Sequence, residues 1–372
     1  MIPKVLFIQT ANAAVTYYRM YCFAQKMHEM GLAKCAVFPE YSPEKIIVPD
    51  WEGNLFKDSL GDLSRYVEWA DFVVCQYIST PEGLSLVEAI KDFKPCFMEV
   101  DDYFPQIPSY SVAYDQNSPG DRQHFWGTRQ LIMSTGVITT TQYLADCYTE
   151  FNTNIHVIPN CIDFDLWDEA ERENHPLIRI GWIGGATHEY DLKIVKKILY
   201  RILERNKNVE VYIVSGPPPA WEETDRLCLS GRWTTIDRYP AYLKSLGYDI
   251  GVAPLRDNYF NRAKSNLRYL EYAACSTPTV SSNVEPFKHD FVGIIAETDL
   301  EWESTLQELI DNEEWRLKLG GLAYDSARQM FNLDDIAKQY ASLIGRTLDG
   351  STNTSKYSNE SVEVRSRNSN IC

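Results

Sequence analysis

The sequence has 372 residues, of which 44% are hydrophobic, and its 36 basic and 52 acidic side chains give a net charge of −16. This length suffices for two domains of ordinary size, and the composition is that of a globular chain. The acidic excess repels polyanions at long range, so it disfavours a nucleic-acid partner without excluding a local basic patch. No uncharged apolar run approaches the ~20 residues that span a bilayer.

The N-terminus and the cysteines indicate the compartment. The first apolar run, residues 5–8, is too short for a signal peptide and predicts a buried first strand. The nine cysteines contain no Cys-x-x-Cys pair, and Cys75, Cys96 and Cys275 fall on predicted core elements. The histidines lack metal-ligand spacing, so no zinc site is predicted. We therefore expect a cytoplasmic protein with reduced, buried thiols.

Strand and helix patterns alternate through the first 162 residues. The predicted strands are 5–8, 33–38, 71–76, 95–100, 136–140 and 155–158. Helical patterns lie at about 16–30 and 63–69. Such alternation is typical of a doubly wound α/β domain with a parallel sheet.

The same alternation restarts after a polar, acidic stretch at 163–176, which we predict to be a linker. Strands are predicted at 178–185, 209–216, 248–255 and 279–281, and long helices at 301–312, 314–330 and 334–348. Residues 351–372 are rich in Ser and Asn and are expected to be disordered. The chain is thus predicted to form two Rossmann-like domains, 1–162 and 177–330.

The segment 261–281 is predicted to form a basic loop, a helix, a turn and a strand. Lys264 and Arg268 stand at the start of the helix, where unpaired N–H groups and the helix dipole favour a phosphate. Glu271 lies within the helix and offers a carboxylate for two ribose hydroxyls. The alternatives are a solvated helix face for the basic residues and a Glu271–Arg268 pair at i, i+3 spacing.

A second candidate loop connects the strand at 178–185 to a helix. Gly184 and Gly185 allow backbone amides to approach a phosphate, and Thr187 is a candidate helix cap. His188 follows and is interpreted as a diphosphate ligand, the alternative being a core histidine. Without more context, this loop also fits a tight turn followed by a capping threonine.

Carboxylates follow the predicted strand 95–100 of the first domain. Asp101 and Asp102 stand at its carboxyl end, where ligands of open α/β sheets bind. They are candidates for orienting an acceptor hydroxyl or taking its proton, or else for capping a helix. Arg19 is a candidate contact for a phosphate or an acidic acceptor, or a partner for the carboxylates near Asp101.

The segment 261–281 resembles the nucleotide-sugar motif of GT-B glycosyltransferases, close to retaining family 4 (the bacterial and phage-type glycosyl transferase group 1). That motif has a glutamate, seven residues, a second glutamate, and then Ala-x-Gly-x-Pro-Val. Glu271 matches the second glutamate and residues 274–280 match the tail, whereas Ala263 stands at the place of the first glutamate. Segments 17–19 and 181–192 are also similar to this group.

The resemblance covers the chain from Lys4 to about Leu348 and implies a GT-B fold, with a final helix at 331–350 crossing back to the first domain. It implies a nucleotide-diphosphate sugar as donor in the second domain, an acceptor, for which we expect a carbohydrate, on the first, a retaining reaction, and no metal or cofactor. The implied catalytic residues are His188, Lys264, Asp101 and Asp102. The implied donor-binding residues are Gly184, Gly185, Thr187, Ser215, Gly216, Arg268 and Glu271. Arg19 and Asn12 are placed on the acceptor side.

Three other functions stay open. A phage-type transferase acting on modified DNA bases would need a basic groove on the first domain. A GT-B sugar-nucleotide epimerase would turn over a donor without an acceptor. A non-catalytic glycan-binding protein would bind the donor without consuming it.

Overall fold

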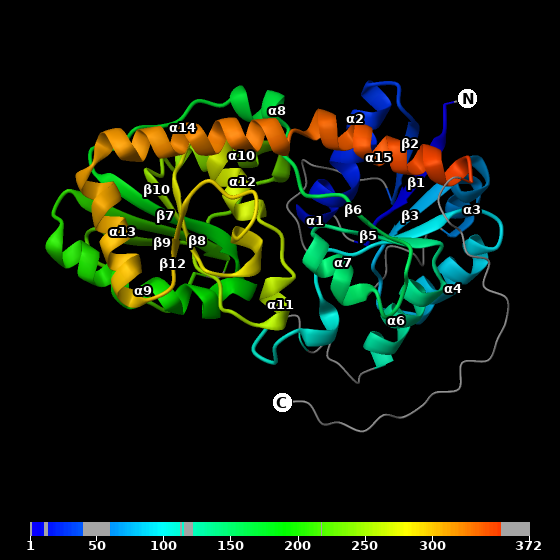
Figure 1. The fold of residues 1–372 in the computed structure, drawn as a ribbon, viewed down its shortest axis with the longest axis horizontal. Helices are drawn as coiled ribbons and strands as arrows, with labels where there is room; N and C mark the ends of the chain where they lie inside the picture. Colours follow the sequence, from blue (N-terminus) through cyan, green and yellow to red (C-terminus); the bar gives the residue numbers. More distant parts are fainter. Residues whose placement is uncertain are drawn as a thin grey trace.

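Two parallel six-stranded sheets lie side by side, each covered by helices (Figure 1). The computed structural model describes residues 2–10, 14–39, 60–111, 114, 122–216 and 218–350. The strand order is β2-β1-β3-β4-β5-β6 in the first sheet and β12-β11-β10-β7-β8-β9 in the second. The predicted α/β fold class is therefore confirmed.

The first sheet forms from residues that were predicted as strands. Its strands are β1 (Lys4–Ile8), β2 (Lys34–Phe38), β3 (Phe72–Gln76), β4 (Cys96–Glu99), β5 (Gly136–Thr139) and β6 (Ile155–Val157). Its helices are α1 (Ala14–Thr16), the π-helix η1 (Tyr17–Tyr21), α2 (Cys22–Glu29), α3 (Leu60–Trp69), α4 (Pro81–Lys91), α6 (Arg122–Met133) and α7 (Gln142–Tyr148). Every residue of β3 is buried, as expected for a central strand covered on both faces.

The second sheet contains two strands that the sequence did not predict, β9 and β12 at its two edges. Its strands are β7 (Ile178–Gly185), β8 (Val209–Gly216), β9 (Leu227–Ser230), β10 (Ile250–Ala253), β11 (Thr279–Ser282) and β12 (Ile294–Ala296). Its helices are α9 (Glu189–Arg205), α10 (Tyr239–Ser245), α11 (Tyr259–Arg262), α12 (Leu267–Ala274), α13 (Asp299–Asp311) and α14 (Glu313–Met330).

The segment 163–176, predicted as a linker, contains helix α8 (Phe164–Asp168). Phe164 and Trp167 are each only 1% exposed and pack in the core cluster that contains Tyr239 and Leu270 of the second domain. The two apolar side chains therefore hold this part of the connection against the second domain.

Helix α15 (Leu333–Leu348) crosses back and packs on the first domain (Figure 1). Its Tyr340 is buried, and the ring contacts Phe7 of β1 and Phe23 of α2 edge-on, with centroids 5.9 and 5.2 Å apart. The segment that leads out of the first domain and the segment that leads back to it are hydrogen-bonded to each other. The Ile162 N–H donates to the Phe331 carbonyl at 2.9 Å. The crossover expected for the final helix is therefore confirmed.

The tail 351–372, expected to be disordered, lies outside the described residues. Among the helices that the structure does describe, none has the length and hydrophobicity needed to cross a membrane.

Candidate active site

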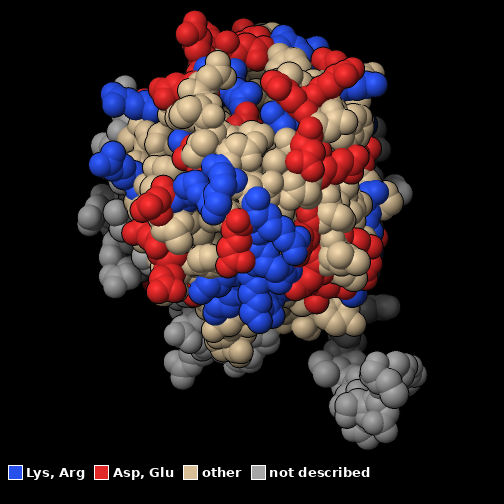
Figure 2. Space-filling view, turned by 90° about the vertical axis from the view of Figure 1, so that its left-hand side faces the viewer, with Lys and Arg blue, Asp and Glu red and all other residues tan. Residues whose placement is uncertain are grey.

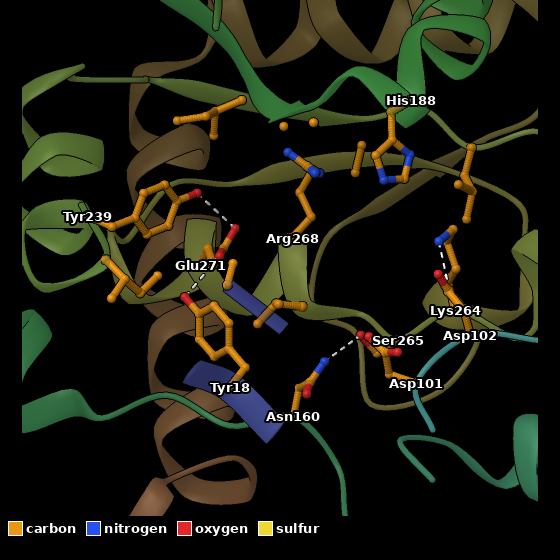
Figure 3. Close-up of a pocket in the computed structure, with 18 of the residues that line it drawn as sticks. Tyr18, Asp101, Asp102, Asn160, His188, Tyr239, Lys264, Ser265, Arg268 and Glu271 are labelled. Atoms are coloured by element: carbon orange, nitrogen blue, oxygen red, sulfur yellow. Dashed lines mark hydrogen bonds and ion pairs between the residues drawn. The ribbon is translucent and has the colours of Figure 1, made fainter. Parts of the chain in front are cut away.

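A cavity of about 280 Å³ lies between the two domains and collects most of the predicted site residues (Figure 3). It is lined from the loop after β4, the loop after β7 and the start of α12, and Tyr18 of η1 closes one side. These loops follow the carboxyl ends of parallel strands, which is where ligands bind in open α/β sheets. We call this space the donor cavity, after the sugar donor that the sequence leads us to expect.

Glu271 on α12 accepts two tyrosine hydroxyls, one from each domain. The Tyr18 hydroxyl donates to Oε1 at 3.0 Å, and the Tyr239 hydroxyl donates to Oε2 at 3.1 Å. Glu271 is 7% exposed, and its burial raises the pKa of the carboxyl, although Arg268 and the two hydroxyls act in the opposite direction. These hydroxyls, and not the predicted alternative partner Arg268, are the hydrogen-bond donors that Glu271 meets. Each carboxylate oxygen has a second lone pair available for a ligand hydroxyl.

Arg268 points into the middle of the cavity, between Glu271 and His188 (Figure 3). Its guanidinium lies over the Trp182 ring, 4.8 Å from the ring centroid. Its Nη1 atom is buried and, in the part of the chain that the structure describes, has no hydrogen-bond partner. A buried cationic donor without a partner is costly, and an anion bound in the cavity would satisfy it.

The glycines of the second candidate loop have different surroundings. A Cβ on Gly184 would lie 2.5 Å from the Arg268 guanidinium, so a side chain there would displace it. A Cβ on Gly185 would meet only the Thr187 hydroxyl, at 3.8 Å, so space for a ligand is left beside this residue. The prediction that Thr187 caps the helix is wrong, because α9 begins at Glu189 with His188 as its N-cap residue.

His188 is held by Asp191, one turn further along. The His188 Nδ1 atom lies 2.9 Å from an Asp191 carboxylate oxygen, and the Asp191 side chain is 5% exposed. The other Asp191 oxygen accepts the Arg256 backbone N–H at 2.9 Å and the Asn261 amide at 3.1 Å. Burial lowers the pKa of His188, and the charges of Lys264 and Arg268 add to this, while Asp191 opposes it. The hydrogen bond at Nδ1 leaves Nε2 as the ring nitrogen available to a ligand.

Lys264 and Asp102 form an ion pair across the two domains. The ammonium lies 2.8 Å from the carboxylate, and the two side chains are 18% and 27% exposed. Asp101 is next to this pair and partly buried. Burial, followed by the charges of Asp102 and Glu99, raises the pKa of Asp101 to about 8.

Arg19 is buried and does not reach the donor cavity. Its Nε atom donates to Glu99 at 2.6 Å, and its Nη1 atom donates to the Asn160 amide oxygen at 3.0 Å. The Asn160 amide group in turn donates to Ser265 of the second domain at 2.7 Å. The structure thus shows Arg19 paired with a carboxylate near Asp101, the alternative considered from the sequence, at 1% exposure and out of direct reach of an acceptor.

The remaining predicted residues lie apart from the cavity or outside the described chain. Ser215 and Gly216 end β8 in register with Gly184 and Gly185. They stand at the same sheet edge, but neither is among the described residues that line the donor cavity. Asn12 lies outside the described residues.

Sequence reasoning missed four polar residues that hold this site together. They are Tyr18, Asn160, Asp191 and Tyr239. Asp191 carried a usable signal, because it stands three residues after His188, in the first turn of α9. Tyr18 lies 253 positions from Glu271, and no local pattern indicates that pairing.

No family model matches the chain, and no curated protein matches it by sequence. Solved structures do. Sucrose-phosphate synthase from Thermosynechococcus elongatus superposes over 94% of this chain and 100% of its own, with a TM-score of 0.65 and 14% identity. The chain has the GT-B fold.

Two further solved structures are similar to this chain; one was solved with a sugar nucleotide, and the other is assigned as an epimerase. Anabaena HepE, solved in complex with UDP-glucose, aligns over 92% of this chain and 99% of its own, with a TM-score of 0.61 and 13% identity. A Listeria monocytogenes protein assigned as a UDP-N-acetylglucosamine 2-epimerase aligns over 94% and 98%, with a TM-score of 0.58 and 12% identity. At these identities, the likeness establishes the fold.

Proposed function

We propose that this protein is a glycosyltransferase that moves a sugar from a nucleotide-diphosphate donor to an acceptor hydroxyl. The observation that carries the proposal is the buried Nη1 atom of Arg268, a residue of the donor cavity, which has no hydrogen-bond partner among the described residues. A diphosphate beside Gly185 would supply the missing acceptor, with Lys264 and His188 at the same end of the cavity. Glu271, at the other end, would accept hydroxyls of the ribose.

The catalytic requirement is to stabilise the negative charge that develops on the leaving diphosphate. Arg268, Lys264 and the amides around Gly185 supply positive groups for this, and a diphosphate would also favour the protonated form of His188. In this proposal these groups carry the diphosphate without a metal ion. The resemblance to retaining family 4 supports retention of the anomeric configuration, and an NMR spectrum of the first product tests it. Inversion would instead favour Asp101 as a base.

The test of the donor site compares a nucleoside diphosphate with its nucleoside in the Arg268→Met variant. The substitution removes the charge and keeps much of the length of the side chain. We expect UDP, or whichever of UDP, ADP and GDP binds tightest, to lose about 1.5–3 kcal/mol of binding free energy. The matching nucleoside lacks the phosphates and should bind both proteins equally. An equal loss for both ligands, or none for either, would remove the basis of the proposal.

The fate of the donor distinguishes a transferase from an epimerase and from a glycan-binding protein. Consumption of the donor only when an acceptor is present supports a transferase. Turnover of the donor without an acceptor supports an epimerase, an activity assigned to the Listeria protein that has a similar structure. Binding without consumption supports a glycan-binding role.

A DNA acceptor is the remaining alternative, and the net charge of −16 does not favour it. Figure 2 shows lysines and arginines gathered at the outer end of the second domain, beside acidic groups. Helix α9, at this end in Figure 1, has Arg201 and Arg205 paired with Glu303. This basic surface is on the second domain, whereas a DNA acceptor would need a basic groove on the first.

A further inference from the structure

A second cavity, of about 230 Å³, adjoins the donor cavity. Three residues line both spaces, namely Asp101, Asp102 and Lys264. A molecule in the second cavity would therefore meet one in the donor cavity at these side chains. It is smaller than the donor cavity, and a single sugar ring is a ligand of suitable size for it.

One wall of the second cavity is aromatic and apolar. The rings of Tyr77 and Phe104 line it and stack on each other at 4.6 Å, with 11° between their planes. Tyr110 also lines it and stacks on Tyr190 of the second domain at 4.4 Å. The Tyr110 hydroxyl accepts a hydrogen bond from Asn258 at 3.2 Å, which fixes this wall between the domains. Ordered rings of this kind offer a surface for the apolar face of a sugar.

Four carboxylates also line the second cavity. They are Glu99, Asp101, Asp102 and Asp191, and Lys264 is the only cation among the described residues that line the cavity. Lys264 is already paired with Asp102. Glu99 is fully buried and its charge is paired with that of Arg19, at 2.6 Å. A phosphate or carboxylate on a ligand here would therefore meet no unpaired cation among the described lining residues, and it would be repelled by the carboxylate of Asp191.

We infer that the second cavity binds an uncharged hydroxylated ring, the size of one sugar, as the acceptor, and rejects acceptors with an anionic group near the reacting hydroxyl. Asp101 and Asp102 accept hydrogen bonds from the acceptor hydroxyls at the boundary with the donor cavity. The aromatic wall holds the apolar face of the ring. This inference rests on the proposed function, because it needs a sugar donor in the adjoining cavity.

The test measures acceptor binding without requiring transfer. Saturation-transfer NMR is recorded on the full chain, saturated with the nucleoside diphosphate that binds tightest among UDP, ADP and GDP. The probes are methyl glycosides of glucose, galactose, mannose and N-acetylglucosamine, each compared with its 6-phosphate. We expect at least one neutral glycoside to bind about tenfold or more tighter than its phosphate. Equal or tighter binding of the phosphates overturns the inference.

Variants then locate the source of the discrimination. Asp102→Asn removes one carboxylate and leaves Lys264 unpaired, so the preference for the neutral glycoside should fall. Asp92→Asn, at a carboxylate that is 68% exposed, is the matched control and should leave the preference unchanged. An unchanged preference in folded Asp102→Asn overturns the assignment, and if that variant does not fold, the comparison on the natural chain decides.

The outcomes separate this inference from the function on which it rests. If the nucleoside diphosphate binds and no neutral glycoside does, the inference fails and the proposed donor site stands. If no nucleoside diphosphate binds, both fail.

Discussion

The sharpest prediction concerns Glu271 and the ribose. Glu271→Gln keeps the shape of the side chain, removes its charge and replaces one acceptor oxygen with a donor group. The carboxylate is 7% exposed, so water screens its hydrogen bonds little. A hydrogen bond to a charged group contributes about 1.5–3 kcal/mol. The dissociation constant of the nucleoside diphosphate should therefore rise by about 13- to 160-fold.

Isothermal titration calorimetry measures the binding of the ribonucleotide and of its 2′-deoxy and 3′-deoxy analogues to the natural chain and to this variant. The two proteins and each pair of ligands form a double-mutant-type cycle. The penalty of Glu271→Gln should shrink for an analogue that lacks a contacted hydroxyl. Tyr239→Phe is the matched control, because it removes a hydrogen bond at Oε2 and leaves the charge. A penalty of the same size for all three nucleotides, in a folded variant, would refute ribose binding by Glu271.

Three further outcomes are expected. Lys264→Met and His188→Gln should each lower turnover by about 10²–10³-fold, with a smaller change in donor affinity. Steady-state kinetics and direct binding measure the two quantities, and a loss mainly of affinity would contradict the prediction. The pKa of Asp101 is raised to about 8, so its protonated form contributes stability below about pH 4 that is lost as the pH rises through 8. In thermal unfolding, the stability of Asp101→Asn relative to the natural chain should increase from pH 5 to pH 9. A stability difference that does not change with pH would contradict this. Ser276→Gly should add up to about 1 kcal/mol of stability, because Ser276 has a φ of +52°; no gain in a denaturant titration would show that the turn is unstrained.

The sequence at 261–281 predicted its local structure well, because local chemistry determines it. The helix, the turn and the strand form within this segment, and Glu271 and Arg268 line the same cavity. Ser276 occupies the place of the motif's glycine and adopts the left-handed conformation that glycine favours. The structure keeps the turn of the motif although the residue differs.

The first-domain side of the site was harder to predict, since its contacts join residues that are far apart in the sequence. Arg19 pairs with Glu99, 80 positions away, and this removes it from the cavity surface. Asp102 meets Lys264 over 162 positions. Strand β9 was also missed. Leu227–Ser230 is too short to show an alternating hydrophobic pattern, and its strand conformation depends on pairing with β8.

The position of α15 has a consequence for the order in which the protein is made. Six apolar residues of this last helix belong to the core cluster of the first domain; they are Leu333, Ile336, Ala337, Tyr340, Leu343 and Ile344. The ribosome therefore releases the first domain with an uncovered apolar face that stays open while the whole second domain is synthesised. We expect nascent chains that stop after Met330 to be cleaved readily by protease in their first domain, and full-length chains to resist. The first half of the polypeptide is thus the last to complete its native core.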